Sequence, residues 1–265
     1  MPHLLLFGPG YTASRIAASL EGEGWRVTRI GRATIDDRAV VAAGIAAATH
    51  ILSSVPPDEA GDPVLGRHGE ALAKAPAGWI GYLSSTGVYG DTGGAWVDES
   101  APVGLGRRGA RVAADAAWQA LHEAVRIFRL PGIYGPGRSA LDRVAGGGGR
   151  RIAVPGQVFS RIHVDDIVAG VRASLRQGPA GAYNLADDLP TSQNAVIEQA
   201  CDLAGLPWPP LTALADAGLS PQARAFYAEN RRVANGKAKR LLDWTPFYPD
   251  YRAGLTALHR GAGAA

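Results

Sequence analysis

Apolar and polar residues follow one another along the first third of the chain in blocks that predict strands alternating with helices. Residues 4–7 are all apolar and end at Gly8, which is the pattern of a strand buried on both faces of a sheet. The next apolar residues recur at helical spacing, at Ala13, Ile16, Ala17 and Leu20. The chain therefore opens with a buried parallel strand and an amphipathic helix.

The same block pattern repeats through residue 130. It predicts strands at residues 25–30, 49–55, 79–84 and 125–130, and helices at residues 39–48, 64–75 and 111–124. Strands that alternate with helices indicate a parallel sheet with right-handed crossovers. The predicted fold class is α/β, a Rossmann-type doubly wound parallel sheet, with a dinucleotide-binding domain over residues 1–133.

The pattern becomes less regular after Pro131, and we expect a smaller C-terminal, substrate-side lobe over residues 134–265. Within it we predict helices at 167–175 and 192–204 and a short strand at 182–185. Parts of residues 151–188 are expected to complete the sheet. The four glycines at 146–149 predict a mobile loop rather than a ligand site.

A glycine-rich loop joins the first strand to the first helix. Its form is G-x-G-x-x-A, made by Gly8, Pro9, Gly10, Tyr11, Thr12 and Ala13. Gly8 permits the tight turn, Gly10 leaves room for a pyrophosphate against the backbone, and Ala13 lets helix and strand pack closely. Free N–H groups at a helix start bind phosphates. Because the motif lies between a strand and a helix, it favours a dinucleotide site over a plain turn.

The residues after the second strand bear on the kind of dinucleotide. An NAD site usually places an acidic residue there for the ribose hydroxyls, whereas this chain has no acid until Asp36. Arg29 and Arg32 are suited to hold a 2′-phosphate. We therefore predict NADP as the cofactor, with NAD possible; the alternative is that both arginines are solvated surface residues.

The composition bears on possible partners, disulfides and cellular location. Hydrophobic residues make up 46% of the 265 residues, which allows a sizeable core, and the net charge of +3 comes without any dense Lys/Arg tract. We therefore expect no nucleic-acid partner. Cys201 is the single cysteine, so no intramolecular disulfide or cysteine metal site is expected. Without a basic leader or an apolar run of about 20 residues, we expect a cytoplasmic protein with no membrane partner.

Several segments resemble the extended short-chain dehydrogenase/reductase superfamily, in its NAD-dependent epimerase/dehydratase group. They occur in the order of that family and cover nearly the whole chain. The segments are S-S-T-G-V-Y-G at 84–90, R-L-P-G-I-Y-G-P-G at 129–137, R-I-H-V-D-D at 161–166, A-Y-N-L at 182–185 and L-L-D-W-T-P at 241–246.

The resemblance implies roles for residues at the ends of predicted strands. Ser85 falls at the position of the family's catalytic Ser/Thr, whose hydroxyl bonds a substrate oxygen. Pro131, Gly132 and Ile133 fall where the chain passes the nicotinamide. The adenine ribose and pyrophosphate would be passed by Ser53, Ser54 and Val55.

Structural explanations exist for the same segments. Ser84, Ser85 and Thr86 suit a turn whose backbone they satisfy. Asp165 or Asp166 suits a helix N-cap. His163 is expected to be a packed histidine, because no second ligand is spaced to form a metal site with it. Aromatic residues expected in the core or between the lobes are Tyr134 and Trp244.

The chain departs from the family at its Tyr-x-x-x-Lys pair, which transfers the proton and binds the nicotinamide ribose. In the register that we favour, Arg107 replaces the tyrosine, Arg111 replaces the lysine, and Asp115 follows at an acidic position. Arginine cannot act as a general base near neutral pH. Arg111 either faces the pocket and binds a ribose or an anion, or faces water and pairs with Asp115.

Two functions remain open. The first is an NAD(P)-dependent oxidoreductase or epimerase acting on a small polar or anionic substrate. Its candidate catalytic residues are Ser85, Tyr89 and Arg111, with Tyr134 a further candidate for proton transfer. The second is a non-catalytic dinucleotide-sensing or scaffolding protein that retains the glycine loop. The resemblance also implies a possible homodimer, formed through helices such as that at 111–124.

Overall fold

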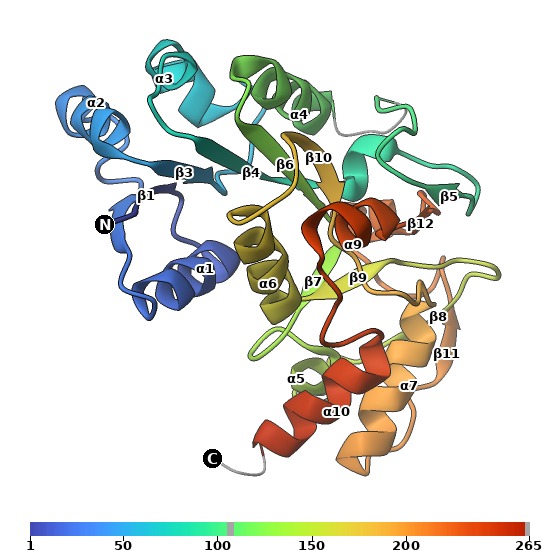
Figure 1. Ribbon diagram of the computed structural model, residues 1–265. Helices are drawn as coiled ribbons and strands as arrows, with labels where there is room; N and C mark the ends of the chain where they lie inside the picture. Colours follow the sequence, from blue (N-terminus) through green and yellow to red (C-terminus); the bar gives the residue numbers. More distant parts are fainter. Residues whose placement is uncertain (105–108, 263–265) are drawn as a thin grey trace.

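The protein is organised around a parallel sheet (Figure 1). The structure, a computed structural model, describes residues 1–104 and 109–262. In these ranges the sheet has six strands in the order β10-β6-β4-β3-β1-β2, and all their pairings are parallel. Their bounds are β1 (His3–Phe7), β2 (Arg26–Ile30), β3 (His50–Ser53), β4 (Trp79–Ser85), β6 (Val125–Leu130) and β10 (Gly181–Asn184). The predicted α/β class is confirmed.

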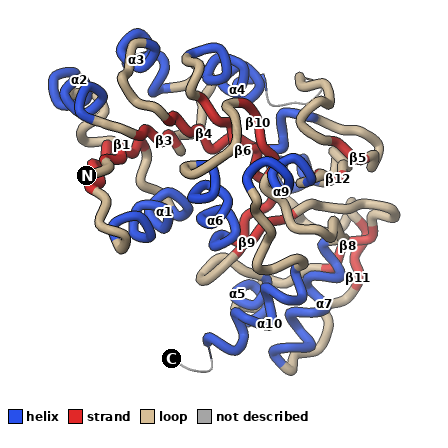
Figure 2. The backbone as a smooth tube through the Cα atoms, viewed as in Figure 1, coloured by secondary structure: helices blue, strands red, loops and turns tan. Residues whose placement is uncertain are grey.

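Helices cover both faces of this sheet (Figures 1 and 2). One face carries α1 (Tyr11–Glu21) and α6 (Val164–Ser174), and the other carries α2 (Arg38–Ala47), α3 (Pro63–Ala73) and α4 (Gly109–Leu121). Side chains of a strand alternate between faces. Leu4 and Leu6 therefore pack with the first helix layer, and Leu5 and Phe7 with the second. This explains why the whole run from Leu4 to Phe7 is apolar.

The strand order creates a switch point between β1 and β3. From β1 the chain crosses to β2 on one side and then to β3 on the other. In open α/β sheets, ligands bind outside the carboxyl ends of the strands at such a point. The carboxyl end of β1 is followed by the glycine loop, and that of β3 by residues 54–56. The topology therefore places both predicted cofactor segments at one edge.

The second lobe packs below the carboxyl edge of the sheet in Figure 1. Buried residues of its main helices form a separate core, which includes Ala140, Ile197 and Leu255. Its elements are α5 (Ala140–Ala145), β8 (Arg151–Ala153), α7 (Gln193–Ala204), β11 (Leu211–Ala213), α8 (Pro221–Phe226) and α10 (Tyr251–Ala262). In contrast, α6, β10 and α9 (Gly236–Leu242) lie with the sheet, so the chain returns to the first unit twice.

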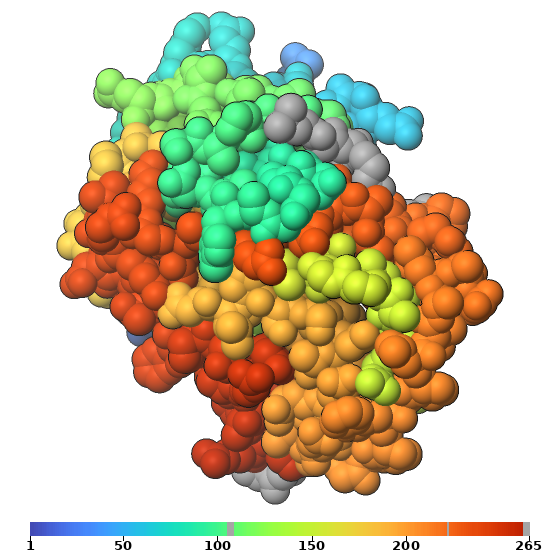
Figure 3. Space-filling view, turned by 90° about the vertical axis from the view of Figure 1, so that its right-hand side faces the viewer, coloured from blue at the N-terminus to red at the C-terminus, as the bar shows by residue number. Residues whose placement is uncertain are grey.

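Short parallel ladders join the two units. Strand β7 (Gly132–Tyr134) pairs with β9 (Arg161–His163), and β5 (Trp96–Val97) pairs with β12 (Arg232–Val233). The β5 segment follows the 3₁₀ turn η1 (Thr86–Tyr89). Figure 3 shows the teal segment that contains β5 beside red C-terminal residues on one face of the molecule. These ladders fix the lobe against the carboxyl edge of the sheet.

Both edge strands of the sheet carry polar groups. Strand β2 has Arg26 and Arg29 on its exposed positions. At the opposite edge, the Asn184 N–H of β10 donates to Glu99 Oε1 at 2.6 Å, and Lys237 Nζ donates to the Ala182 carbonyl at 2.8 Å. Backbone groups of β10 that face away from β6 are therefore satisfied by side chains.

Candidate functional site

The loop after β1 has the geometry that the glycine motif predicts. Gly8 has φ of +72°, and a Cβ built on it lies 2.8 Å from Val55 Cγ2. The Ser54 hydroxyl donates to the Gly8 carbonyl at 2.5 Å, and the Gly10 N–H donates to the same carbonyl at 2.7 Å. Only glycine fits at position 8 without strain. The contacts with Ser54 and Val55 hold the turn against the end of β3.

Helix α1 begins directly after this turn with an open N-terminus. Its N-cap is Gly10, which offers no side-chain acceptor, and its first turn contains no acidic residue. A Cβ on Gly10 has only the Gly8 carbonyl oxygen nearby, at 4.0 Å. Thr12 and Ala13 are buried beneath the turn. The first N–H groups of a helix have no intrahelical acceptor and attract anions. The turn thus has the geometry of an anion-binding cradle.

Tyr11 connects this turn to the segment after β7. Its hydroxyl donates to the Pro136 carbonyl at 3.0 Å. The guanidinium carbons of Arg15 and Arg138 lie 5.0 and 5.7 Å from the centre of its ring. These contacts close one side of the cradle and add two positive charges to its surroundings.

The two arginines after β2 have different surroundings. Arg29 donates to both carboxylate oxygens of Glu21 at 2.7 Å, so its guanidinium is already engaged by α1. Arg32 is exposed, and it has no ion pair or hydrogen bond among the described residues. Asp36, the first acid after the strand, pairs with Arg67 at 2.6 Å. Of the two arginines, Arg32 is therefore the one available to an anion.

The two serines that end β4 have different surroundings: Ser84 is buried in the protein interior, and Ser85 lines the cleft. Ser84 is buried, and its hydroxyl donates to Asp115 at 2.6 Å. The Ser85 Oγ accepts the Gly87 N–H at 3.1 Å, which is the turn contact that we considered as an alternative, and Ser85 also lines the cleft described below. Ser53, at the end of β3, is fully buried, and its hydroxyl has no hydrogen-bond partner among the described residues.

Asp115 is the centre of a buried polar network. Its carboxylate accepts from Arg129 at 2.8 Å and from Gln119 at 2.6 Å, in addition to Ser84. It is not bonded to Arg111, so the pairing that would follow from a water-facing Arg111 does not occur. Instead, Arg111 lines the cleft, with no ion-pair partner among the described residues. Arg107, the predicted replacement of the family's tyrosine, lies outside the described residues.

Tyr89 lies beneath the cleft, where it has no exposed surface. Its hydroxyl donates to Asn184 Oδ1 at 2.8 Å and accepts from Arg129 at 3.0 Å. Burial raises the pKa of this hydroxyl above its ordinary value. The structure therefore brings Ser85 and Arg111 together at the cleft and places Tyr89 apart from them, as a support of Arg129.

The segment after β6 forms the floor between the two lobes. Pro131, Gly132 and Ile133 line the cleft, and the ladder with β9 holds this segment in place. Tyr134 is buried against α10, where its hydroxyl donates to the Asp250 carbonyl at 3.4 Å. Its pKa is raised by burial, so it is poorly suited to give up a proton. Tyr134 is a lobe-contact residue, as expected.

His163 is buried at the start of α6 and caps that helix. Its Nδ1 accepts the Asp165 N–H at 3.3 Å, which corrects our expectation that Asp165 or Asp166 would be the N-cap. Burial lowers the pKa of His163. Asp166 instead accepts the N–H groups of Phe247 and Tyr248 at 2.5 and 3.1 Å, and burial raises its pKa to about 6.

A cleft of about 1200 Å³ joins all these segments. It extends from the cradle at Gly10 and the β4 end at Ser85 into the second lobe. Arginines from both units line it: Arg111, Arg138, Arg143, Arg150, Arg161 and Arg231. The acidic lining residues are Asp142 and Glu229. The described wall is therefore strongly positive.

Sequence reasoning identified Arg111 but missed the other arginines of this wall. They are dispersed between residues 138 and 231, on short elements and loops without a sequence motif. Gly148 also lines the cleft. The loop at 146–149 therefore borders the cleft.

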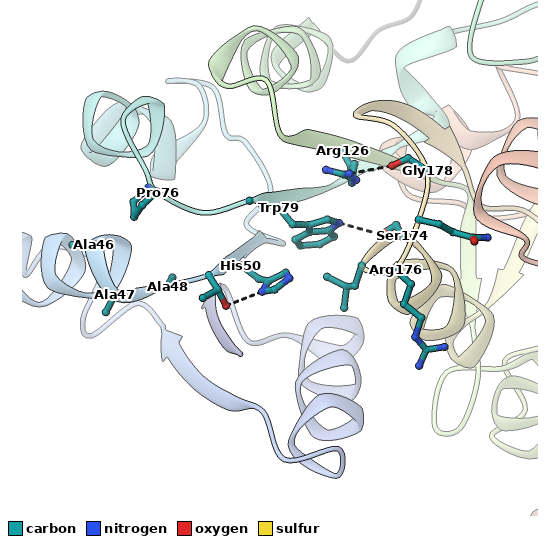
Figure 4. A pocket seen from close by; sticks show the side chains of 14 residues that line it. Ala46, Ala47, Ala48, His50, Pro76, Trp79, Arg126, Ser174, Arg176 and Gly178 are labelled. Atoms are coloured by element: carbon teal, nitrogen blue, oxygen red, sulfur yellow. Dashed lines mark hydrogen bonds between the residues drawn. The ribbon is translucent and has the colours of Figure 1, made fainter. Parts of the chain in front are cut away.

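A second hollow, of about 680 Å³, lies at the amino edge of the sheet (Figure 4). Trp79 Nε1 donates to Ser174 Oγ at 3.3 Å, and Arg126 donates to the Gly178 carbonyl at 3.0 Å. These contacts join the end of α6 to strands β4 and β6. The polar groups of this hollow serve the junction between sheet and helix.

The described residues contain no group of three or more metal-ligating side chains and no helix long and apolar enough to cross a membrane. Burial of Asp187 next to the lobe junction raises its pKa to about 8. This carboxyl is therefore protonated in part at neutral pH, and it offsets the nearby charge of Arg161 only in part.

Comparisons with known proteins agree with this architecture. No family model matches the chain. A conserved protein of unknown function from Silicibacter pomeroyi DSS is 44% identical, with a TM-score of 0.90 and coverage of 98% of this chain and 99% of that one. A 3-diazoavenalumate denitrifying reductase from a Streptomyces species is 28% identical over 144 residues. That match spans 49% of this chain and only 45% of the reductase.

More distant structures share the fold. A dTDP-glucose 4,6-dehydratase from Streptomyces venezuelae, solved with NAD, is 18% identical with a TM-score of 0.80, and 99% and 97% of the two chains are covered. The human epimerase family protein SDR39U1, solved with NADPH, is 18% identical with a TM-score of 0.76, and 97% and 99% are covered.

These structures show the fold of the chain: it is the fold of the extended short-chain dehydrogenase/reductases of the NAD-dependent epimerase/dehydratase group. The resemblance found in the sequence motifs is confirmed in this respect. The chain belongs to the same family as the Silicibacter pomeroyi protein.

Proposed function

We propose that the protein is an NADP(H)-dependent oxidoreductase that acts on a small anionic substrate. The observation that carries this proposal is the continuous cleft that connects the helix-start cradle to an arginine-lined second lobe. The cradle supplies a site for a pyrophosphate, and the lobe supplies a site for a second anion. Reduction is favoured over epimerisation by the match to a reductase, which spans part of the chain.

The chain's own residues fit a dinucleotide. The free N–H groups at the start of α1 would hold the pyrophosphate. Ser54 would border the adenosine side, whereas the predicted neighbours Ser53 and Val55 lie behind the turn and do not line the cleft. Pro131, Gly132 and Ile133 would border the nicotinamide. A bound dinucleotide would supply the hydride, which is the chemistry that the protein itself lacks.

Arg32 would select the 2′-phosphate of NADP(H). It is exposed at the end of β2 with its guanidinium unpaired among the described residues, whereas Arg29 is occupied by Glu21. No acidic residue follows β2 at the position where NAD-binding proteins hold the ribose hydroxyls. The first acidic residue after the strand, Asp36, is paired with Arg67. A guanidinium binds a phosphate with two parallel hydrogen bonds.

Ser85 and Arg111 are the proposed catalytic residues. Both line the cleft where the β4 end meets α4. The Ser85 hydroxyl would hydrogen-bond the oxygen of the substrate, and Arg111 would hold a developing or resident negative charge. Arg111 stays protonated near neutral pH and does not serve as a base. Any proton delivered to the product would come through Ser85 and a water rather than from a Tyr-Lys pair.

Nucleotide titrations followed by thermal shift and calorimetry test the cofactor. We expect NADPH to bind at least tenfold more tightly than NADH. Arg32→Gln should reduce this preference at least tenfold by weakening NADPH alone. Arg29→Gln is the matched control, with a change below threefold because Arg29 faces Glu21. Equal binding of both nucleotides, or a loss confined to Arg29→Gln, overturns the assignment.

The alternative function is a dinucleotide sensor without turnover, favoured by arginine in place of the family's Tyr-Lys pair. It predicts the same NADPH affinity but no oxidation of NADPH with any carbonyl or imine substrate. A substrate screen monitored by NADPH absorbance separates the two. If the wild type oxidises NADPH with a substrate and Ser85→Ala does so more slowly, the protein is an enzyme rather than a sensor.

A further inference from the structure

Two arginines of the second lobe lie close together in the cleft. Arg143 projects from α5 and Arg161 from β9. The charge of Arg143 acts directly on Arg161, and both act on the hydroxyl of Tyr227. Burial, with a contribution from Arg143, lowers the pKa of Arg161 to about 10. Both guanidinium groups are still charged at neutral pH, so like charges face each other here.

Asp187 acts on Arg161, but burial raises the pKa of Asp187 to about 8, so it offsets the charge of Arg161 only in part. The other carboxylates around this pair are bonded to neighbouring groups. Asp142 accepts from the N–H and hydroxyl of Ser139 at 2.6 Å each, in a capping box. Glu229 pairs with Arg231 at 2.8 Å. Within residues 1–104 and 109–262, neither Arg143 nor Arg161 forms an ion pair with a carboxylate. Burying charge without a counter-charge is costly, so the pair is arranged for an anion from outside.

Arg161 is also held rigidly in its place. Its guanidinium donates to the Phe159 and Thr191 carbonyls at 2.8 and 3.0 Å and to Gln193 Oε1 at 3.2 Å. All these acceptors are neutral, so they fix the orientation without cancelling the charge. A pre-oriented cation binds an anion with little loss of conformational entropy.

The wall beside these cations is apolar. Phe159 packs edge-on against Tyr227, with ring centres 5.6 Å apart, and the Arg161 guanidinium lies 5.9 Å from the Phe159 ring. Further apolar side chains of the second lobe line the cleft: Ile152, Val158, Val196, Ile197, Leu219 and Leu255. Such a wall matches a hydrocarbon or aromatic body.

The cleft is also limited in size. Pockets for a single drug-sized ligand measure about 300–1000 Å³. The whole cleft measures about 1200 Å³, and the pyrophosphate and nicotinamide of a bound dinucleotide would share it. The sugar and base of a second nucleotide would meet the apolar wall, which suits them poorly.

From these observations we infer that the substrate is a small carboxylate with an apolar or aromatic body. Its carboxylate lies between Arg143 and Arg161, with the Tyr227 hydroxyl as a further donor, and its body lies against Phe159. This inference rests on the proposed function, because it takes the second lobe as the substrate site.

Binding of simple compounds tests the inference. The compounds are 3-phenylpropionate, its uncharged amide, propionate and UDP, each titrated by calorimetry with and without saturating NADPH. We expect 3-phenylpropionate to bind at least tenfold more tightly than either the amide or propionate, because it satisfies both the cations and the wall. UDP should bind more weakly than 3-phenylpropionate.

Variants distinguish binding at this site from nonspecific attraction of anions to the positively charged protein. Arg143→Gln should weaken 3-phenylpropionate binding at least tenfold and leave the amide unchanged, and it removes no described hydrogen bond. Arg176→Gln, an exposed arginine at the opposite edge of the sheet, should change neither by more than twofold. Equal binding of acid and amide, or tighter binding of UDP, overturns the inference. If NADPH binds normally in that case, the cofactor part of the proposed function stands, while failure of NADPH binding rejects the proposed function itself.

Discussion

Arg111 and Asp115 lie one helical turn apart on α4 but face different surroundings. Asp115 is buried and bonded to Arg129, while Arg111 lines the cleft. The sequence left the orientation of Arg111 open because the alanines around it do not fix the phase of the helix. The structure decides it through Asp115, whose buried partners Ser84 and Arg129 come from β4 and β6. Such partners are distant in sequence and leave no local pattern.

Asp187 provides a test at the scale of one residue. Its pKa is raised by burial from about 3.9 in an unfolded chain to about 8. The folded protein therefore binds the additional proton between these values, and the free energy of unfolding falls as pH rises from about 4 to about 8. Asp187→Asn removes this dependence. We expect the variant to gain roughly 1–3 kcal/mol over the wild type between pH 5 and pH 8, measured by urea unfolding.

The exposed residue Asp216 supplies the control, because Asp216→Asn should follow the wild type at every pH. A stability difference between Asp187→Asn and the wild type that stays constant with pH would show that Asp187 ionises normally.

At the scale of elements, the strands of the main sheet and the helices between them up to residue 130 could be predicted because each buries several apolar residues in a clear period, whereas the two-residue strand β5 could not. The glycine loop could be predicted because its chemistry is local. Strands β7, β8, β9 and β11 could not, since three residues are too few to show a period. Helix α6 was expected from residue 167 but begins at Val164, because the buried His163 supplies the cap. The arginine wall escaped prediction because tertiary structure assembles it from separate elements.

The glycine loop offers a prediction with two separable effects. Gly8→Ala should lower the free energy of unfolding by about 1–2 kcal/mol, because φ is +72° and the new Cβ meets Val55. Gly10→Ala has room in the empty protein and should cost less than about 1 kcal/mol. It should still weaken NADPH binding at least tenfold, since its Cβ points into the cradle.

Gly69→Ala, in the middle of α3 with open space around it, is the control and should be slightly stabilising without changing NADPH affinity. Normal NADPH binding by Gly10→Ala would remove the cradle as the pyrophosphate site. The measurements are chemical denaturation and calorimetry.

At the scale of the whole molecule, the C-terminal segment is fastened to the sheet unit by Asp166. The Trp244 indole donates to the Asp166 carbonyl at 3.1 Å, and the Asp166 carboxylate accepts two backbone N–H groups from residues 247 and 248. Asp166→Asn keeps one acceptor oxygen and loses the other. We expect a loss of about 1–3 kcal/mol and faster proteolytic cleavage after Trp244.

The neighbouring variant Asp165→Asn is the matched control. Asp165 is half exposed and lies 3.8 Å from Arg15, so its loss should change stability by less than about 0.5 kcal/mol. Equal proteolysis of the two variants would mean that the C-terminal segment is held by its apolar contacts alone.

The side chains along the outer strands of the sheet have a consequence for how copies of the protein meet. Neither edge strand is free to pair with a strand of another molecule. Charged arginines lie on β2, and side chains of Glu99 and Lys237 bond the backbone of β10. Growth into fibrils through these strands is disfavoured even at high concentration. Any pairing of two molecules therefore falls to helix surfaces, among which α4 offers a smooth patch formed by Ala113, Ala116, Ala117 and Ala120.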